Sequence, residues 1–421
     1  MEQPVRSGRS ARSRAPGAGA AQAAAGGDAD GRVVVVGHGP VALAVARAWP
    51  GARLLEDAPP ARDAGSTVAA AEPATAPPVS RAERVATTAG EPSAASSGVP
   101  SAASSGEPAS VSDPAAAAAP PSAFETAFAG VDVVVLVALP GEPVPGHGWR
   151  ERQAALVAHT QRVLAAARAA KVRHVVAVTS AVVHGARPDR PLIHDDEPLQ
   201  RADEAARDGL VGDLLAVESV LARAARRRAP LLTVLRPAPV VGPGIDTFVT
   251  RHFEAPRLLT VRGADRQWQF VHVDDLAAAA RLVVERRMAG GYTVGAPDVL
   301  TAAQVEAASG MRRIELAAAT AFGTAERLHR VGVLPSASGE LAFVVYPWTV
   351  ASDGLTAAGW MPEHSSARCL DVLLEGVQGR LAVAGRRVGA RDAAALGAAG
   401  AAVALIGTAA IWRQARHRRR R

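Results

Sequence analysis

Short runs of branched apolar residues, separated by segments of helical spacing, constrain the fold of this chain most strongly. A strand that is apolar along its whole length is buried on both faces of its sheet, which is typical of parallel sheets. Strands that alternate with helices predict an α/β fold with a doubly wound parallel sheet. The predicted strands are 32–37, 52–55, 131–139, 172–179 and 231–235, and the predicted helices are 44–49, 154–170 and 210–225.

Composition separates this α/β core from segments that cannot form one. Residues 1–31 are rich in Arg, Ala and Gly, and residues 58–121 are rich in Pro, Ala, Ser and Gly, with the heptapeptide 92–98 repeated at 100–106. We predict a disordered N-terminus and a disordered insertion that acts as a spacer, because such segments bury too little apolar surface to fold. The predicted main domain comprises residues 32–57 and 122–300, interrupted by the disordered insertion 58–121 and preceded by the disordered N-terminus 1–31. A small α/β domain comprises 301–385 with parts of 185–205 and 240–270. An apolar helix, 393–412, and a basic tail, 413–421, follow it.

The net charge of +7 is a property of the two tails. Arginines cluster in the first fourteen residues and again in the last nine, which argues against specific nucleic-acid binding by the folded part. The single cysteine, Cys369, excludes an intramolecular disulfide and fits a reducing compartment. Residues 1–31 lack the apolar stretch of a signal peptide, so we expect a cytoplasmic protein.

A glycine-rich turn follows the first predicted strand. Gly37-His38-Gly39-Pro40-Val41-Ala42 has the Gly-x-Gly-x-x-Ala form of the dinucleotide fingerprint, with a strand before it and a helix after it. Gly37 permits the tight turn, Gly39 lets a pyrophosphate approach the backbone, and Ala42 allows close packing of helix on strand. Pro40 lacks the N–H that other residues would offer to a phosphate. The alternative is a glycine turn that serves packing alone.

An acidic pair stands about twenty residues after the first glycine of the turn. The strand 52–55 ends at Glu56-Asp57, where a carboxylate would accept hydrogen bonds from the adenosine ribose hydroxyls. The same carboxylate would repel a 2′-phosphate. The predicted cofactor is therefore NAD, with NADP less favoured.

Three further segments carry a family resemblance. Thr179–Gly185, Leu235–Gly244 and Gln269–Ala277 resemble the Ser-Ser-x-x-Val-Tyr-Gly, Arg-Pro-x-x-x-Tyr/Val-Gly-Pro and Phe-Val-His-Val-Asp-Asp-Val-Ala segments of the extended short-chain dehydrogenases/reductases, the NAD-dependent epimerase/dehydratase family. Their order and spacing match as well. The resemblance covers about residues 32–57 and 122–375.

The resemblance implies roles for individual residues. Ser180 takes the position of the catalytic serine, and Pro237 and Ala238 would lie near the nicotinamide. His272 and Asp275 begin a helix under the small domain, where Asp274 is expected to cap it and a structural role for His272 and Asp275 is as plausible as a catalytic one. The cofactor-binding residues implied together are Gly37, Gly39, Ala42, Glu56, Asp57, Ala138, Leu139, Ser180, Pro237 and Ala238.

Two departures limit the resemblance. The glycine turn is one residue shorter than the usual Gly-x-x-Gly-x-x-Gly. The helix that should carry Tyr-x-x-x-Lys has Leu210 and Leu214 instead, and the only lysine of the chain, Lys171, precedes a different strand. The acid/base pair of the family is therefore absent.

His184 stands four residues after Ser180 and titrates near neutrality in its unperturbed state. One hypothesis is a Ser180/His184 proton relay. The other is a histidine that lines the cleft and makes a neutral hydrogen bond. The sequence shows no cluster of metal ligands.

The segment Ala393–Trp412 contains twenty uncharged residues between arginine-rich flanks. As a helix it would be about 30 Å long, the thickness of a bilayer core. Cytoplasmic NAD binding and a C-terminal arginine tail favour a helix that lies on anionic lipid over one that spans the bilayer. The alternative is a soluble terminal helix.

Two functional hypotheses follow. One is an oxidoreductase or epimerase/dehydratase that acts on a small-molecule substrate, sugar-nucleotide-like or lipid-like. The other is a non-catalytic NAD-binding sensor or scaffold at the membrane. The resemblance also implies a homodimer formed through the helices 154–170 and 210–225.

Overall fold

The computed structural model describes residues 32–56, 123–139, 148–201, 209–330 and 338–378, together with 382–383 and 386–387. The predicted disordered segments, the candidate membrane helix 393–412 and the tail 413–421 lie outside these residues. Among the described residues, no helix is long and apolar enough to cross a membrane.

The centre of the fold is a six-stranded sheet in the order β10-β5-β4-β3-β1-β2. Every neighbouring pair in it is parallel, which confirms the predicted sheet. The strands are β1 (Val33–Val36), β2 (Arg53–Leu55), β3 (Val133–Val137), β4 (His174–Val178), β5 (Leu231–Pro237) and β10 (Gly290–Val294).

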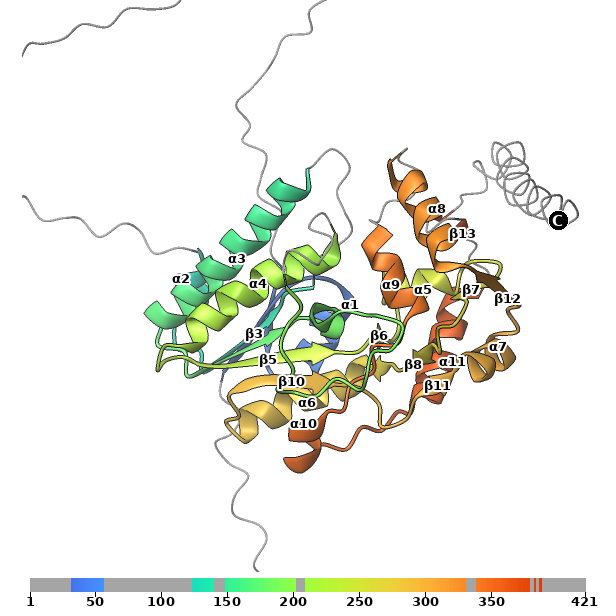
Figure 1. Ribbon diagram of the computed structural model, residues 1–421. Coiled ribbons are helices and arrows are strands. Elements are labelled where there is room, and N and C mark those ends of the chain that lie inside the picture. The colour runs from blue at the N-terminus through green and yellow to red at the C-terminus, as the bar shows by residue number, and fades with distance from the viewer. Residues whose placement is uncertain are drawn as a thin grey trace, which may run out of the picture. The chain divides into compact units, whose positions relative to one another are not determined.

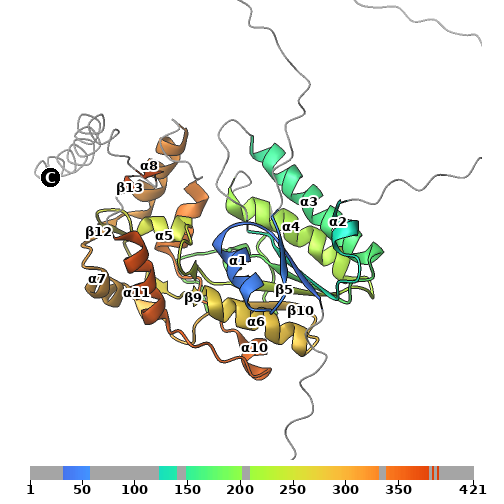
Figure 2. The same ribbon diagram turned by 180° about the vertical axis from the view of Figure 1, so that it is seen from behind.

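Helices cover both faces of this sheet (Figures 1 and 2). On one face lie α1 (Gly39–Arg47) and α6 (Val273–Glu285), and on the other α2 (Ala123–Ala127), α3 (Trp149–Ala169) and α4 (Leu210–Ala225). The side chains of β1 alternate between the faces: Val33 and Val35 join the core under α1 and α6, whereas Val34 and Val36 join the core under α3 and α4. This is the doubly wound arrangement that the sequence predicts.

The predicted helix bounds need two corrections. Helix α3 begins at Trp149 rather than 154, and α1 begins at Gly39 rather than 44. The earlier start of α1 follows from Pro40, whose fixed φ and missing N–H suit the first turn of a helix. Helix α4 spans the predicted residues 210–225.

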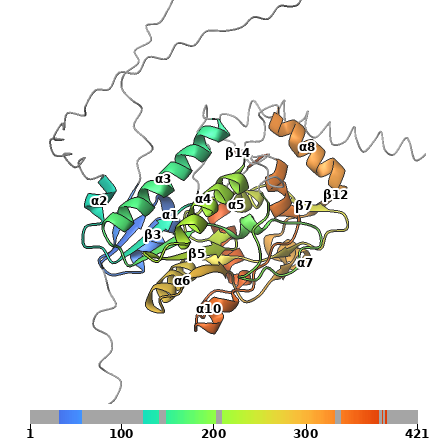
Figure 3. The ribbon, with the colours of Figure 1, turned by 60° about the vertical axis from the view of Figure 1, so that its left-hand side comes forward.

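A second layer of short elements lies beyond the edge where the sheet strands end (Figures 1 and 3). Its core is rich in aromatic side chains, with Phe253, Trp268 and Phe270 in mutual ring contact. The elements are η1 (Ala181–His184), β6 (Val240–Val241), α5 (Phe248–His252), β7 (Leu258–Val261), β8 (Gln267–Trp268), β9 (Val271–His272), β11 (Leu300–Thr301), α7 (Ala302–Ser309), β12 (Arg313–Leu316), α8 (Ala318–Arg330), η2 (Ser338–Leu341), α9 (Ala342–Val345), α11 (Ser366–Val377), β13 (Ala382–Val383) and β14 (Arg386–Arg387). The pairs β6–β9 and β7–β12 are parallel, and β8–β11 and β13–β14 are antiparallel. Helix α10 (Asp353–Ala357) instead packs on β10 and α6, and its Leu355 joins the core under α1 and α6.

Candidate functional site

The glycine turn joins the end of β1 to helix α1. Gly37 has a φ of +147°, and a Cβ added to it would lie 2.9 Å from the Cβ of Val137 and 3.5 Å from that of Ala42. Ala42 is fully buried, so a larger residue at either position would push α1 away from the sheet. Gly37 and Ala42 thus allow α1 to pack closely on the sheet.

Gly39 differs from Gly37 because it faces open space. Its φ is +79°, and among the described residues no atom beyond its chain neighbours and the backbone of α1 lies within 4 Å of a Cβ built there. The residue before the helix, His38, makes no capping hydrogen bond through its side chain. The backbone N–H groups of the first turn of α1 have no acceptor within the helix, and such groups bind phosphate readily. The turn thus fits the pyrophosphate of a dinucleotide.

A loop from the second layer approaches this turn. Gly244, which follows β6 and has a φ of +74°, lies close enough that an added Cβ would be 3.5 Å from Cγ of Pro40. Ile245 packs against the apolar core that contains α1. The Arg-Pro segment found in the sequence and the glycine turn are therefore brought together.

The acidic pair is described only in part. Glu56 follows β2 directly and is exposed, and the strand is fixed to the turn by a hydrogen bond from the Gly37 N–H to the Leu55 carbonyl at 3.1 Å. Asp57 lies outside the described residues. Glu56 therefore stands at the same strand edge as the turn, where a ribose-binding carboxylate is expected.

The ends of β3, β4 and β5 meet beside the turn. Ala138 is buried and donates its N–H to the Val178 carbonyl at 2.9 Å, and Leu139 is half-buried against the core under α1. Ser180 follows β4, and its hydroxyl donates a long hydrogen bond of 3.5 Å to the Pro237 carbonyl at the end of β5. Ala238 is buried and donates its N–H to Val294 of β10.

Ser180 also caps the short helix η1. Its Oγ accepts a hydrogen bond of 3.4 Å from the N–H of Val182. The serine hydroxyl is thus held by two backbone groups. Both bonds are long and therefore weak, so a ligand oxygen can replace them.

His184 is buried at the end of η1, with 2% of its surface exposed. Its Nδ1 lies 3.4 Å from the Pro198 carbonyl, which can only accept, so Nδ1 carries the proton and Nε2 is an acceptor. Burial, and then the charge of Arg236, lowers the pKa of His184 to about 4. Among the described residues, Nε2 has no hydrogen-bond partner, and Ser180 and His184 share no hydrogen bond.

Leucines fill the positions where the resemblance expects an acid/base pair. Leu214 is fully buried in the core of the second layer, and Leu210 packs against that core. Between them, Asp213 is buried and accepts a hydrogen bond of 2.6 Å from Nε of Arg152 on α3. Burial raises the pKa of Asp213 against the opposing effect of Arg152.

The structure also reveals a buried network that the sequence does not indicate. Glu218 of α4 accepts hydrogen bonds from Nε of Arg236 at 2.9 Å, from Nη2 of Arg236 at 3.0 Å and from the hydroxyl of Thr179 at 2.8 Å. Thr179 and Arg236 belong to two of the segments that carry the resemblance, but in the sequence Glu218 is only a charged residue among the apolar positions of α4. Thr179 and Arg236 directly precede Ser180 and Pro237 in the chain.

The predicted His272 and Asp275 have structural roles. His272, and not Asp274, caps α6: its Nδ1 accepts a hydrogen bond from the N–H of Asp274 at 3.3 Å, which corrects the expected cap. The Asp275 carboxylate accepts hydrogen bonds from the N–H groups of Glu363 at 2.8 Å and His364 at 3.1 Å, and its Oδ2 lies 3.0 Å from Nδ1 of His364. These bonds tie α6 to the loop before α11.

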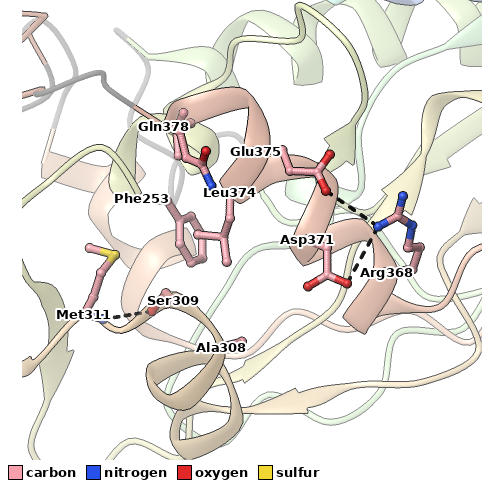
Figure 4. Close-up of a pocket in the computed structure, with 10 residues that line it drawn as sticks. Phe253, Ala308, Ser309, Met311, Arg368, Asp371, Leu374, Glu375 and Gln378 are labelled. Carbon is pink, nitrogen blue, oxygen red and sulfur yellow. Dashed lines mark hydrogen bonds and ion pairs between the residues drawn. The ribbon is translucent and has the colours of Figure 1, made fainter.

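A separate hollow of about 470 Å³ lies in the second layer (Figure 4). Phe253 and Leu374 contribute apolar lining, and Arg368 lies 3.8 Å from carboxylate oxygens of both Asp371 and Glu375 at one side. None of its lining residues belongs to the glycine turn or to the ends of β3, β4 and β5. The described residues contain no group of His, Cys, Asp and Glu that could hold a metal ion.

The chain matches a known family over its middle part. Residues 102–295 match the sequence model of the NAD dependent epimerase/dehydratase family. An uncharacterized protein of Mycobacterium tuberculosis is 29% identical over 145 residues, which are 34% of this chain and 38% of that protein, and an uncharacterized protein of Mycobacterium bovis matches with the same figures. The chain thus spans well under two thirds of the length of these curated relatives.

Solved structures of low sequence identity resemble the fold. The protein gox2253 is 19% identical, with 62% of this chain and 84% of that chain covered and a TM-score of 0.49. UDP-N-acetylglucosamine 4-epimerase from Bacillus cereus is 13% identical, with 61% and 82% covered and a TM-score of 0.43. UDP-glucuronic acid 4-epimerase from Bacillus cereus, in complex with NAD, is 12% identical, with 61% and 77% covered and a TM-score of 0.44. Residues 102–295 of this chain are thus similar in sequence to the NAD dependent epimerase/dehydratase family.

Proposed function

We propose that the chain binds NAD at the edge where the sheet strands end, and acts as an oxidoreductase or epimerase/dehydratase. The observation that carries this proposal is the glycine turn. Gly37 is packed tightly against Val137, whereas Gly39 faces open space at the N-terminus of α1, which is the arrangement that a pyrophosphate requires. The NAD dependent family that residues 102–295 resemble in sequence supports the same cofactor.

The proposed chemistry assigns roles to Ser180 and His184. Bound NAD supplies the hydride acceptor. The Ser180 hydroxyl, freed from its long bonds, donates a hydrogen bond to a substrate oxygen. His184 is neutral before the reaction, and its Nε2, unpartnered among the described residues, is the proposed acceptor of the proton that the substrate hydroxyl loses when the hydride leaves the carbon. The proposed substrate is a sugar-nucleotide-like or lipid-like molecule with an oxidisable hydroxyl.

Two readouts test this activity: the absorbance of the reduced cofactor detects a net oxidation, and chromatography of the products detects an epimerisation or dehydration, in which the hydride returns to the substrate. We expect one of these two signals when the NAD-loaded protein meets an accepted substrate from a panel of nucleotide sugars and hydroxylated lipids. The Ser180→Ala variant should react at least about 100-fold more slowly, the usual size of a general acid–base contribution. Full turnover by this variant would remove Ser180 from the mechanism.

A second candidate function is a non-catalytic NAD-binding sensor or scaffold. The specific observation in its favour is the apolar packing of Leu210 and Leu214 at the expected acid/base positions. NAD binding with neither reduced cofactor nor a converted product from any member of the panel would favour this function over the first.

Glu56 is proposed to set the preference for NAD over NADP. Its carboxylate would accept from the ribose hydroxyls and repel a 2′-phosphate. Titrations of both cofactors should show tighter binding of NAD, and Glu56→Gln should narrow the difference. Glu315→Gln, at an exposed position of β12, is the control. An unchanged preference in Glu56→Gln would contradict this role.

We also propose that residues 393–412 and the arginine tail attach the chain to anionic lipid. Fractionation of the full-length protein against a 1–390 truncation tests the attachment, and equal solubility would contradict it.

We further propose that the chain forms a homodimer through α3 and α4. Light scattering tests the dimer, and a monomer mass at micromolar concentration would contradict it.

A further inference from the structure

The buried network of Thr179, Glu218 and Arg236 joins three elements that flank the candidate site. Glu218 and Arg236 form two parallel hydrogen bonds with side chains that are 3% and 12% exposed, and the Thr179 hydroxyl donates to the same Oε1 of Glu218. Bidentate pairing fixes orientation as well as distance, because the planar guanidinium matches the two carboxylate oxygens.

The position of the network in the chain matters as much as its geometry. Thr179 immediately precedes Ser180, and Arg236 immediately precedes Pro237, whose carbonyl accepts from the Ser180 hydroxyl. The backbone of Thr179 also donates to the Leu235 carbonyl at 2.9 Å. A shift of the guanidinium would therefore move the ends of β4 and β5, and the Ser180 and Pro237 segments with them.

Strand β10, which neighbours β5, leaves space for the same guanidinium. A Cβ added to Gly291 of β10 would lie 2.9 Å from Cζ of Arg236, so the glycine leaves the space that the side chain occupies. A buried ion pair is in general no more stabilising than apolar residues of the same volume, because both charges lose their hydration. Stability alone therefore does not account for the network.

We propose that Arg236, held by Glu218 and Thr179, is a positioning residue that fixes the gap between Ser180 and the Pro237–Ala238 segment in the shape that receives the nicotinamide end of the cofactor. This inference rests on the proposed function, which places NAD at this edge of the sheet. Arg236 acts through Ser180 and Pro237 and does not itself contact the reacting atoms.

The test compares three variants of the full-length protein: Arg236→Lys, the double variant Glu218→Leu/Arg236→Met, and Thr179→Val. A lysine keeps the charge but cannot span both carboxylate oxygens, and the double variant replaces the pair by apolar groups. Arg313→Lys, in an ion pair between β12 and α7 of the second layer, is the matched control. NAD affinity, the thermal midpoint and hydrogen exchange of the ligand-free protein are measured for each.

The positioning role predicts an effect on binding that exceeds the effect on stability. Arg236→Lys and the double variant should bind NAD about five- to tenfold more weakly, because the site is no longer pre-organised. In the ligand-free protein, the amides of Thr179 and Val183 should exchange faster while the thermal midpoint of the double variant stays close to that of the parent. Thr179→Val should show the same pattern to a smaller extent, and Arg313→Lys should show neither change.

Unchanged NAD affinity and unchanged exchange at residues 179–183 in a folded Arg236→Lys variant would overturn the inference. If the parent protein binds no NAD, the proposed function fails, and hydrogen exchange still shows separately whether Arg236 holds residues 179–183 in place. If the double variant does not fold, Arg236→Lys and Thr179→Val give the answer.

Discussion

Replacing Gly39 by alanine tests whether this glycine is needed to bind a ligand or only to allow a positive φ. Gly263 serves as the comparison. Gly263, in the turn between β7 and β8, has the same φ of +79°, and in the described part of the chain an added Cβ would likewise meet no atom within 4 Å apart from its chain neighbours. The two substitutions therefore impose the same local strain in the ligand-free protein. Only Gly39 lies at the N-terminus of α1, where a pyrophosphate would meet the added methyl group.

The expected stability cost is small and equal for the two variants. An alanine in the left-handed region costs about 1–2 kcal/mol, and about 0.4–1 kcal/mol of this is offset by the lower entropy of the unfolded chain. The net loss of about 1 kcal/mol should lower the thermal midpoint by roughly 2–4 °C in each variant, measured by calorimetry or circular dichroism.

The expected effects on NAD binding differ. Gly39→Ala should weaken NAD binding at least about tenfold, which corresponds to about 1.4 kcal/mol, because the methyl group occupies the approach of the phosphates. Gly263→Ala should bind NAD like the parent protein. Equal NAD affinity in the two variants, measured by titration calorimetry, would refute the assignment of the glycine turn.

Further predictions concern stability. Asp275→Ala should lower the free energy of unfolding by about 1–3 kcal/mol, because two partly buried N–H groups lose their charged acceptor, and an unchanged urea midpoint would contradict the anchoring role. Arg266→Met should cost about 1–3 kcal/mol, since the guanidinium donates to the carbonyls of Phe343 and Val344, and urea denaturation measures it. The free energy of unfolding should have its full value above about pH 6.5 and fall as the pH drops towards 4. Burial lowers the folded-state pKa values of three histidines to about 4, so the unfolded state takes up protons at a higher pH than the folded state does. These histidines are His174, His184 and His252. Each should add a slope of up to about 1.4 kcal/mol per pH unit to the free energy of unfolding between these pH values. A free energy of unfolding that does not change with pH would contradict this prediction.

The sequence predicts the sheet well because its strands are apolar throughout. A run such as 131–139 has the same signature wherever it occurs, and its strand β3 was expected within two residues at each end. The glycine turn is equally predictable from sequence, because the strand-to-helix turn at Gly37, Gly39 and Ala42 depends on local backbone geometry. Sequence-based predictions agree with the structure where a strand or turn is determined by residues that are close together in the chain.

The buried network could not be predicted in this way. Glu218 lies 39 positions from Thr179 and 18 from Arg236, so their meeting depends on how α4 packs over β4 and β5. The role of Asp275 was ambiguous for the same reason, because the N–H groups that bond to its carboxylate lie on the loop before α11. A residue type alone does not distinguish a helix cap or an anchor from a catalytic group.

The central claim is that this chain binds NAD at the turn between β1 and α1. Titration calorimetry of NAD into the full-length protein tests it most directly. We predict a single site per chain with a dissociation constant below about 1 mM, equivalent to more than about 4 kcal/mol of binding free energy. The absence of any binding heat for both NAD and NADP at millimolar concentration would contradict the claim.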